Sequence, residues 1–229
     1  MKLRHLLAAP LAFVCITSAL AQDLPKPTPT GFLSDYALLS PSLTSDANFH
    51  SYTTPSALGR PLGRVYIQPL TSYPEDAQFN YIDRATLAAL ASKFDAALNA
   101  NLTGKIILVP TPDQADTVVQ MAVTAVAAVE PNRGVVDYLP IRLITKPIKD
   151  AAMGKQQEVV VTMEMKMRDA KSDQVIYESL ATTTGKTMGR SGDQVLRADM
   201  KTLDPVIEAW TEKVAQSLTK LQPGVAMVN

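Results

Sequence analysis

The chain of 229 residues is poor in the side chains that most often carry out chemistry. It contains one cysteine, two histidines and one tryptophan, and 22 basic residues balance 22 acidic ones. Because Cys15 lies in a short apolar stretch near the start, disulfides, thiol nucleophiles and thiolate zinc sites are excluded for the rest of the chain. The balanced charge argues against nucleic acid as a partner, since nucleic-acid binding relies on a concentrated positive surface.

A targeting signal is predicted at residues 1–21. A basic start precedes an apolar core at residues 6–16, and Ala19–Ala21 has the small-x-small pattern that signal peptidase cuts. We therefore expect cleavage between Ala21 and Gln22 and an exported, periplasmic chain, with an association with the outer membrane left open. No transmembrane segment is expected in the mature chain, because no later apolar run is long enough.

Cys15 has a second interpretation, as the lipid-bearing cysteine of a bacterial lipoprotein. Such sites carry a small residue directly before the cysteine, whereas Val14 and the bulky Phe13 precede it here. Removal with the signal is therefore the preferred interpretation. Removing residues 1–21 leaves 208 residues, with 20 basic against 22 acidic side chains and a net charge of −2. That length suits one domain.

The mature chain is predicted to be a single α/β domain behind a spacer. Residues 22–30 alternate proline with polar residues, which is typical of an extended, unpaired segment. The domain is expected to span residues 31–229. Prolines and glycines interrupt its first part, residues 31–63, which we expect to be an irregular strap over the surface.

The most strongly patterned segment is a predicted hairpin at residues 158–185. Apolar and polar side chains alternate over residues 158–168, as in a strand with one buried face. The polar run 169–173 predicts a turn, and residues 174–183 return as a second strand that Gly185 closes. A hairpin is marginal by itself, so this one needs a sheet and a helix on its apolar face.

Other periodic segments supply the sheet and the helices. Apolar runs predict strands at residues 64–70, 105–110 and 115–129, the last one central and covered on both faces. Apolar spacings of three and four predict a helix at residues 81–101 capped by Asp83, and a final helix capped by Asp204, with residues 194–203 as an additional turn or two. Residues 135–154 are predicted to form a loop or a broken edge strand.

The predicted fold class is α+β. A mixed sheet of about five strands, in the order strand, helix, four strands, helix, is packed by two helices. The first helix makes a right-handed parallel crossover between its flanking strands. Trp210, at helical spacing in the last helix, is expected to anchor the core.

Two short motifs suggest chemistry only weakly. Residues 184–187 resemble the end of a phosphate-binding loop, but Leu180 stands where that pattern needs glycine, so a flexible turn is preferred. Met163, Met165 and Met167 share one strand face, and thioethers suit Cu(I). Core packing is the preferred explanation, because methionine fills irregular apolar space.

The remaining polar candidates are weaker still. His50 is the only histidine beyond the signal, and we expect it to be solvated rather than a catalytic base. The serines lack a Gly-x-Ser-x-Gly elbow. The polar residues of the outer hairpin face are expected to form a solvated surface: Glu164, Lys166, Arg168 and Glu178. No catalytic, metal-binding or cofactor-binding residue is predicted.

Several short motifs together carry a resemblance. They are Phe32-Leu-Ser-Asp-Tyr36 with Leu39, Tyr52 and Pro55, Val65-Tyr-Ile-Gln-Pro69, Met163–Asp169 with the returning strand, and Ala209-Trp210. With them the chain resembles a family of bacterial predicted envelope proteins of unknown function, many of them lipoproteins. It departs from that family in lacking a good lipid-attachment cysteine. The resemblance covers nearly all of the mature chain and implies location and fold, with no activity to carry over.

The order of elements also resembles the small α/β domains of periplasmic assembly and trafficking proteins, although fold does not fix function. The favoured function is a non-enzymatic periplasmic adaptor that binds another envelope component. Its contact surface is expected at aromatic residues of the strap, of the first strand and of the apolar segment 138–144. These aromatic residues are Phe32, Tyr36, Tyr52, Tyr66 and Tyr138.

Two alternatives stay open. One is a carrier of a small apolar or lipid-like ligand held between sheet and helices, which a well-formed internal cavity would favour. The other is a hydrolase with carboxylate or serine chemistry, whose site the sequence spacing does not reveal. The identity of the partner and the oligomeric state are open as well.

Overall fold

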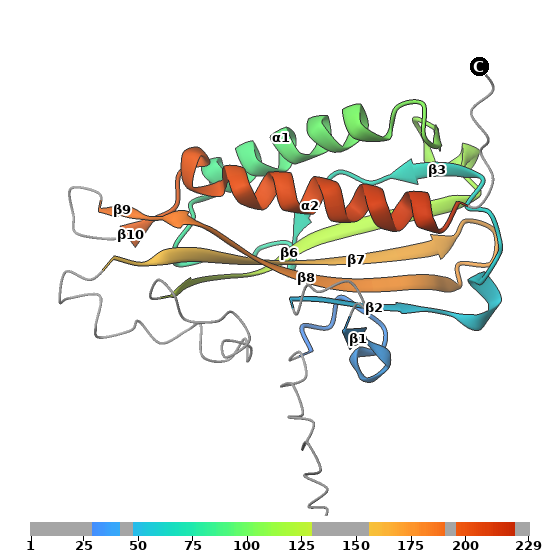
Figure 1. Ribbon diagram of the computed structural model, residues 1–229, viewed down its shortest axis with the longest axis horizontal. Coiled ribbons are helices and arrows are strands. Elements are labelled where there is room, and N and C mark those ends of the chain that lie inside the picture. The colour runs from blue at the N-terminus through green and yellow to red at the C-terminus, as the bar shows by residue number, and fades with distance from the viewer. Residues whose placement is uncertain (1–28, 42–47, 130–155, 191–195, 223–229) are drawn as a thin grey trace, which may run out of the picture.

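A computed structural model describes residues 29–41, 48–129, 156–190 and 196–222 (Figure 1). Its longer strands are β2 (Phe49–Thr53), β3 (Arg64–Ile67), β6 (Thr117–Val129), β7 (Glu158–Asp169) and β8 (Val175–Thr187). Its two-residue strands are β1 (Ser40–Pro41), β4 (Thr71–Ser72), β5 (Ile107–Leu108), β9 (Gly189–Arg190) and β10 (Leu196–Arg197). The α-helices are α1 (Arg84–Leu102) and α2 (Met200–Lys220).

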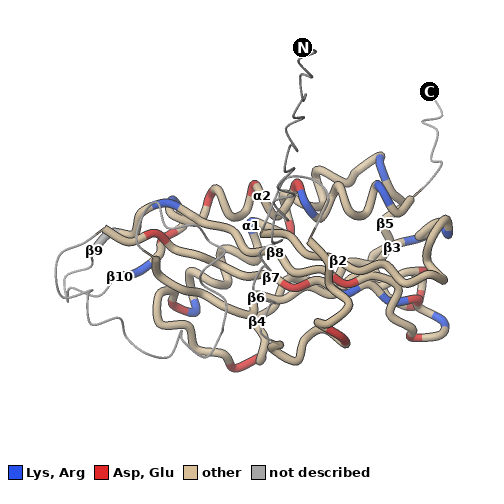
Figure 2. The backbone as a smooth tube through the Cα atoms, turned by 60° about the horizontal axis from the view of Figure 1, so that its bottom comes forward, with Lys and Arg blue, Asp and Glu red and all other residues tan. Residues whose placement is uncertain are grey.

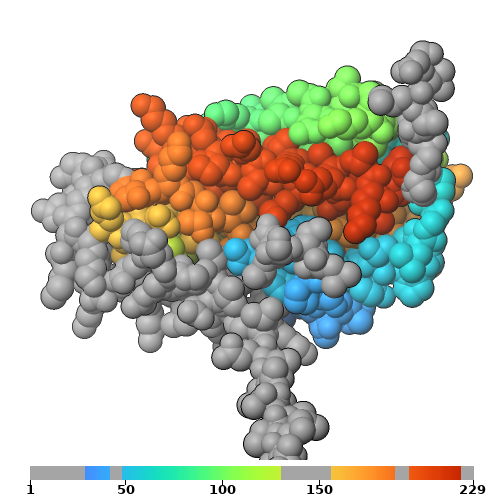
Figure 3. All heavy atoms as spheres, viewed as in Figure 1, coloured from blue at the N-terminus to red at the C-terminus, as the bar shows by residue number. Residues whose placement is uncertain are grey.

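The described strands form one mixed sheet of eight and a separate pair. The large sheet runs β1-β2-β8-β7-β6-β3-β5, with β4 beside β6, and β9 pairs with β10. Both helices cover the same face of the sheet and lie side by side (Figures 1 and 3). The predicted α+β class is confirmed, whereas the expected count of about five strands was too low.

The predicted hairpin forms the middle of the sheet. β7 pairs antiparallel with both β8 and β6, so its alternating side chains face the helices on one side and residues 29–41 on the other. At the turn, the Asp169 carboxylate accepts N–H bonds from Ser172 (2.8 Å) and Lys171 (3.0 Å). These bonds and an ion pair with Arg60 lower the pKa of Asp169 to about 2.

The apolar face of the hairpin is packed against the helices. Met163, Met165 and Met167 are at most 2% exposed and lie in the main core cluster. Trp210 is fully buried, and its ring meets Phe94 of α1 edge-to-face at 6.2 Å between centroids. The interpretation of the methionines and of Trp210 as core residues is confirmed.

Helix α1 follows its sequence signals closely. The Asp83 carboxylate accepts the Thr86 N–H at 2.7 Å as the N-cap, and Gly104 adopts a φ of +77° just after the helix. The short strand β4 precedes α1, and β3 and β5, before and after these two elements, pair in parallel as the strand-helix-strand order predicts. β6 lies centrally between β3 and β7.

Helix α2 begins earlier than predicted. Its N-cap is Asp199, whose carboxylate accepts the Thr202 N–H at 2.8 Å within a reciprocal capping box, so the cap at Asp204 was wrong. Pro205 lies inside the helix, where its missing N–H costs only the bond to the carbonyl of Lys201. The capping box satisfies two backbone donors and therefore outcompetes the Asp-Pro signal.

Two other expectations were wrong. The strap is not irregular throughout, because residues 49–53 form β2 and pair with β8 in register with Ser51 opposite Ser179. Residues 184–187 belong to β8 instead of forming a turn. Gly185 is needed there because a Cβ would lie 2.5 Å from the Thr202 carbonyl oxygen of α2.

Several predictions fall outside the described residues. These are the signal at 1–21 with its cleavage at Ala21 and Gln22, the spacer up to residue 28, and the segment around Tyr138. Within the described part, neither helix combines the length and apolar character needed to cross a bilayer. Basic and acidic residues are interspersed along the described backbone (Figure 2).

We expect Gly185→Ala to lower the free energy of unfolding by about 1–3 kcal/mol, because the added methyl group overpacks the contact between β8 and α2. Lys186→Ala, at the exposed neighbouring position, should change it by less than about 0.5 kcal/mol. Chemical denaturation of both variants measures this. Equal stability of Gly185→Ala and the parent protein would contradict the packing described.

Candidate functional site

A carboxylate is buried on the sheet face opposite the helices. Glu164, in the middle of β7, has no exposed surface. Its oxygens accept hydroxyl hydrogen bonds from Tyr36 (2.5 Å), Thr30 (3.0 Å) and Thr124 (3.0 Å). Two of these donors belong to residues 29–41, which we call the strap segment, and the third belongs to β6.

A second buried carboxylate holds the next part of the strap segment. Glu178 of β8 is 2% exposed and accepts the backbone N–H groups of Ser34 (2.5 Å) and Asp35 (3.4 Å). The Lys166 ammonium donates to the Phe32 carbonyl at 3.0 Å and lies 5.0 Å from the centre of the Phe32 ring. The strap segment is therefore fixed by polar side chains of both hairpin strands.

Apolar contacts complete this attachment. Leu33 and Tyr36 form a small cluster with Leu180 of β8, and Phe32 meets Tyr73 edge-to-face at 5.5 Å. The solvated outer face predicted from the alternation was wrong for Glu164 and Glu178. Alternation identifies the side chains that point away from the helices, but it does not show that another segment covers them.

The environment of Glu164 shifts its titration. Burial raises the pKa of Glu164, while the three hydroxyl donors oppose that rise and nearby Glu178 adds to it. Burial and the bond to Glu164 also raise the pKa of Tyr36. Because the strap segment fills the space at these groups, the two carboxylates attach a segment of the chain and do not line a cleft for a substrate.

His50 was expected to be solvated, and this was wrong. It lies in β2 between β1 and β8, is 8% exposed, and its Nδ1 has no hydrogen-bond partner within the described part of the chain. Burial lowers the pKa of His50, which favours the neutral imidazole. The Ser, Thr and Tyr residues around His50 gave no sign in the sequence that this segment forms strand β2.

The predicted aromatic contact surface is only partly exposed. Tyr36 is buried because its hydroxyl bonds to Glu164, so its expected exposure is corrected. Phe32, Tyr52 and Tyr66 are each half-buried, and Tyr138 lies outside the described residues. Binding of a partner by these aromatic residues stays a prediction.

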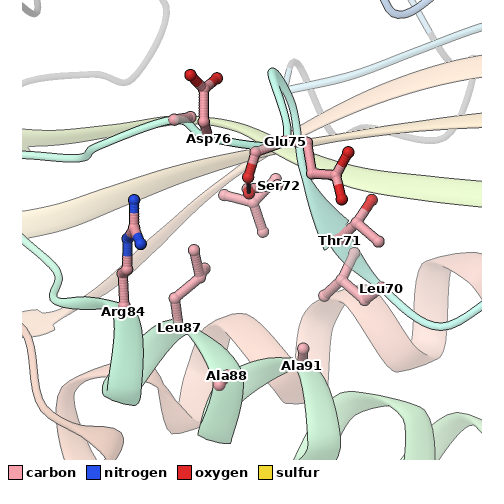
Figure 4. A pocket seen from close by; sticks show the side chains of 11 residues that line it. Leu70, Thr71, Ser72, Glu75, Asp76, Arg84, Leu87, Ala88 and Ala91 are labelled. Atoms are coloured by element: carbon pink, nitrogen blue, oxygen red, sulfur yellow. Dashed lines mark hydrogen bonds between the residues drawn. The ribbon is translucent and has the colours of Figure 1, made fainter.

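An open groove of about 690 Å³ lies between α1, β4 and the loop after β4 (Figure 4). Leu70, Leu87, Ala91 and Val123 are among its apolar lining residues. We call this space the α1 groove. Sequence reasoning missed it, since it arises from the packing of a two-residue strand against the alanine-rich part of α1.

Charged side chains surround the mouth of the α1 groove. Arg84 rises from the first turn of α1, and Glu75 and Asp76 stand on the opposite loop (Figure 4). Asp95 of α1 fixes the wall by accepting the Leu70 N–H at 3.2 Å, and burial raises the pKa of Asp95. The groove thus combines an apolar interior with charges of both signs.

The hydroxyl groups of Thr71 and Ser72 at the α1 groove lie close to backbone carbonyls. The Ser72 hydroxyl donates to the backbone carbonyl of Glu75 at 3.1 Å, so its hydrogen bond goes to a group that cannot act as a base. In the part of the chain that the structure describes, no group of three or more His, Cys, Asp or Glu side chains is placed to hold a metal ion.

Comparison with known proteins identifies a family. The model of a family described as "Protein of unknown function (DUF3313)" matches residues 28–214. The match covers most of the chain and agrees with the resemblance to bacterial proteins of unknown function. A search of curated proteins finds no match.

Solved structures show weak likenesses. The PelC dodecamer from Paraburkholderia phytofirmans is 18% identical, with 76% of this chain and 96% of that chain covered and a TM-score of 0.36. The hypothetical protein CT253 from Chlamydia trachomatis is 13% identical, covering 68% and 97%, with a TM-score of 0.41. Lipoprotein GNA1162 from Neisseria meningitidis is 9% identical, covering 69% and 99%, with a TM-score of 0.34. Likenesses this weak carry no argument about function.

We expect Glu164→Gln to be at least as stable as the parent protein near neutral pH. Its oxygen can accept from one of the hydroxyls of Tyr36 and Thr124 and its amide group can donate to the other, without burying a charge. Since the folded-state pKa of Glu164 is raised, the parent protein loses stability as pH rises from the unfolded pKa through the folded pKa. The advantage of the variant should therefore grow with pH.

Denaturation curves between pH 5 and pH 8 measure this difference. Glu75→Gln, which removes an exposed carboxylate, is the matched control and should show no such trend. A variant that is less stable than the parent by the same amount at every pH would show that the charge itself holds the strap segment.

Proposed function

Since the chain belongs to the DUF3313 family, whose function is unknown, we propose its role from its own geometry. The protein is an exported, non-enzymatic adaptor of the bacterial cell envelope, and it binds another envelope protein in the α1 groove. The observation that supports this is the open apolar groove with Arg84, Glu75 and Asp76 at its mouth. An apolar centre with a polar rim is the usual composition of a protein contact site.

The shape of the α1 groove suits a side chain or short segment of a partner better than an enclosed ligand. It is open to solvent along its length, whereas carriers bury most of their ligand. Leu87 and Ala91 are half-buried and Ala88 is exposed, so a partner would cover apolar surface that water now reaches. This burial supplies the driving force for binding.

The position of the strap segment supports the same surface. Residues 29–41 lie on the sheet face opposite α1 and α2 (Figure 1). None of these residues lines the α1 groove. A partner in the groove would therefore not have to displace the strap segment.

A photo-crosslinking amino acid at Ala88, which lines the α1 groove, should capture a defined envelope protein in intact cells. The same amino acid at Ala89 is the matched control, because Ala89 is also exposed on α1 but does not line the groove. Mass spectrometry of the adducts identifies the partner. Identical adducts at both positions, or none at Ala88, would contradict binding in the groove.

A separate prediction concerns the export of the protein. The mature protein should begin at Gln22 and be recovered in the periplasmic fraction, because the Ala19–Ala21 pattern directs cleavage after Ala21. Mass spectrometry of the N-terminal peptide measures this. A lipid-modified Cys15 would show membrane anchoring instead, and an uncleaved start in the cytoplasm would contradict export.

A further inference from the structure

The outer edge of the sheet has a gap beside β4. β3 and β4 follow one another along the same side of β6, and β5 pairs with β3 but not with β4. Among the described strands, none therefore pairs with the outer edge of β4. The α1 groove lies at this edge, because Leu70, Thr71 and Ser72 form one of its walls.

The pairing of β4 with β6 does not use the backbone of Ser72. Tyr73 donates its N–H to the Val123 carbonyl at 2.9 Å, within the parallel register that places Ser72 opposite Val123. Successive residues of a strand direct their backbone groups to opposite edges, so the N–H and C=O of Ser72 point away from β6. Neither group has a hydrogen-bond partner in the part of the chain that the structure describes.

A contact with helix α1 shows the direction of this edge. The Leu70 N–H, two residues before Ser72 and therefore on the same edge, donates to the Asp95 carboxylate of α1 at 3.2 Å. One and two turns earlier in α1, Ala91 and Ala88 offer no polar side chain to the Ser72 backbone (Figure 4). The helix thus supplies a partner for the edge at Leu70 and leaves the edge free at Ser72.

The charged side chains at the mouth of the groove are also without partners. Within the described residues, the ion pairs join other side chains, and Arg84, Glu75 and Asp76 take part in none of them. A segment that carries charges of both signs beside an apolar residue would therefore meet complementary groups at this mouth.

We propose that the α1 groove binds an extended segment of the partner, which adds a short strand to the outer edge of β4. This inference rests on the proposed function and specifies the form of the partner. One residue of the segment exchanges two backbone hydrogen bonds with Ser72. An apolar side chain beside it packs on Leu87 and Ala91, and an acidic side chain reaches Arg84.

A helical segment fits the same groove less well. The backbone groups of a helix are already bonded to one another, so a helix would cover the Ser72 N–H and C=O without pairing them. Covering polar groups that stay unpaired is unfavourable, whereas an added strand replaces the water bonded to them. The free edge of β4 therefore favours an extended occupant.

Proline at position 72 tests the added strand. Ser72→Pro removes the N–H from the outer edge, while the bond from Tyr73 to β6 remains, and proline is tolerated at such edge positions. The yield of the partner adduct from a photo-crosslinking amino acid at Ala88 should fall at least tenfold in Ser72→Pro. Ser72→Ala, which removes the hydroxyl and keeps the N–H, is the matched control and should retain the adduct.

Hydrogen exchange gives an independent measurement on the parent protein. Adding the protein identified in the Ala88 adduct should slow exchange of the Ser72 amide at least tenfold. Exchange of the Ser34 amide, in the strap segment on the opposite face of the sheet, should not change. Unchanged exchange at Ser72 would overturn the proposal, including where thermal unfolding shows that Ser72→Pro does not fold.

The outcomes separate this inference from the proposed function. A folded Ser72→Pro with the full adduct yield would overturn the added strand and leave the α1 groove as a contact site. Absence of any adduct at Ala88 in the otherwise unchanged protein would contradict binding in the groove and overturn the added strand with it.

Discussion

The buried carboxylate of Glu164 determines how the strap segment and the sheet depend on each other. A carboxylate without exposed surface costs several kcal/mol unless hydrogen bonds replace its water. Tyr36 and Thr30 supply these bonds from the strap segment, and Thr124 supplies one from β6. Loss of the strap segment would leave Glu164 with fewer donors, so β7 and the strap segment are stable together.

This dependence divides the molecule into two sides. On one side, Glu164 and Glu178 are already occupied by the chain itself. On the other side, the helices pack on the methionine face of β7, and the α1 groove stays open. Binding of a partner is therefore expected on the helix-bearing side.

Much of this fold could be predicted from local patterns. The alternation in β7 and the Asp83 cap of α1 each depend on neighbouring residues, and both were read correctly. The cap at Asp199 and the strand β2 were missed, because one depends on a reciprocal bond with Thr202 and the other on pairing with β8. The sites were missed for the same reason, since Glu164 and the α1 groove acquire their environments from segments far away in the sequence.

Hydrogen exchange of the strap segment tests the central claim most directly. The amides of Ser34 and Asp35, which donate to Glu178, should exchange far more slowly than unstructured amides, and Tyr36→Phe should accelerate their exchange while β7 stays protected. Exchange of these amides at the rate of an unfolded chain, in the parent protein, would contradict the account, because Glu164 would then have to be buried without the strap segment.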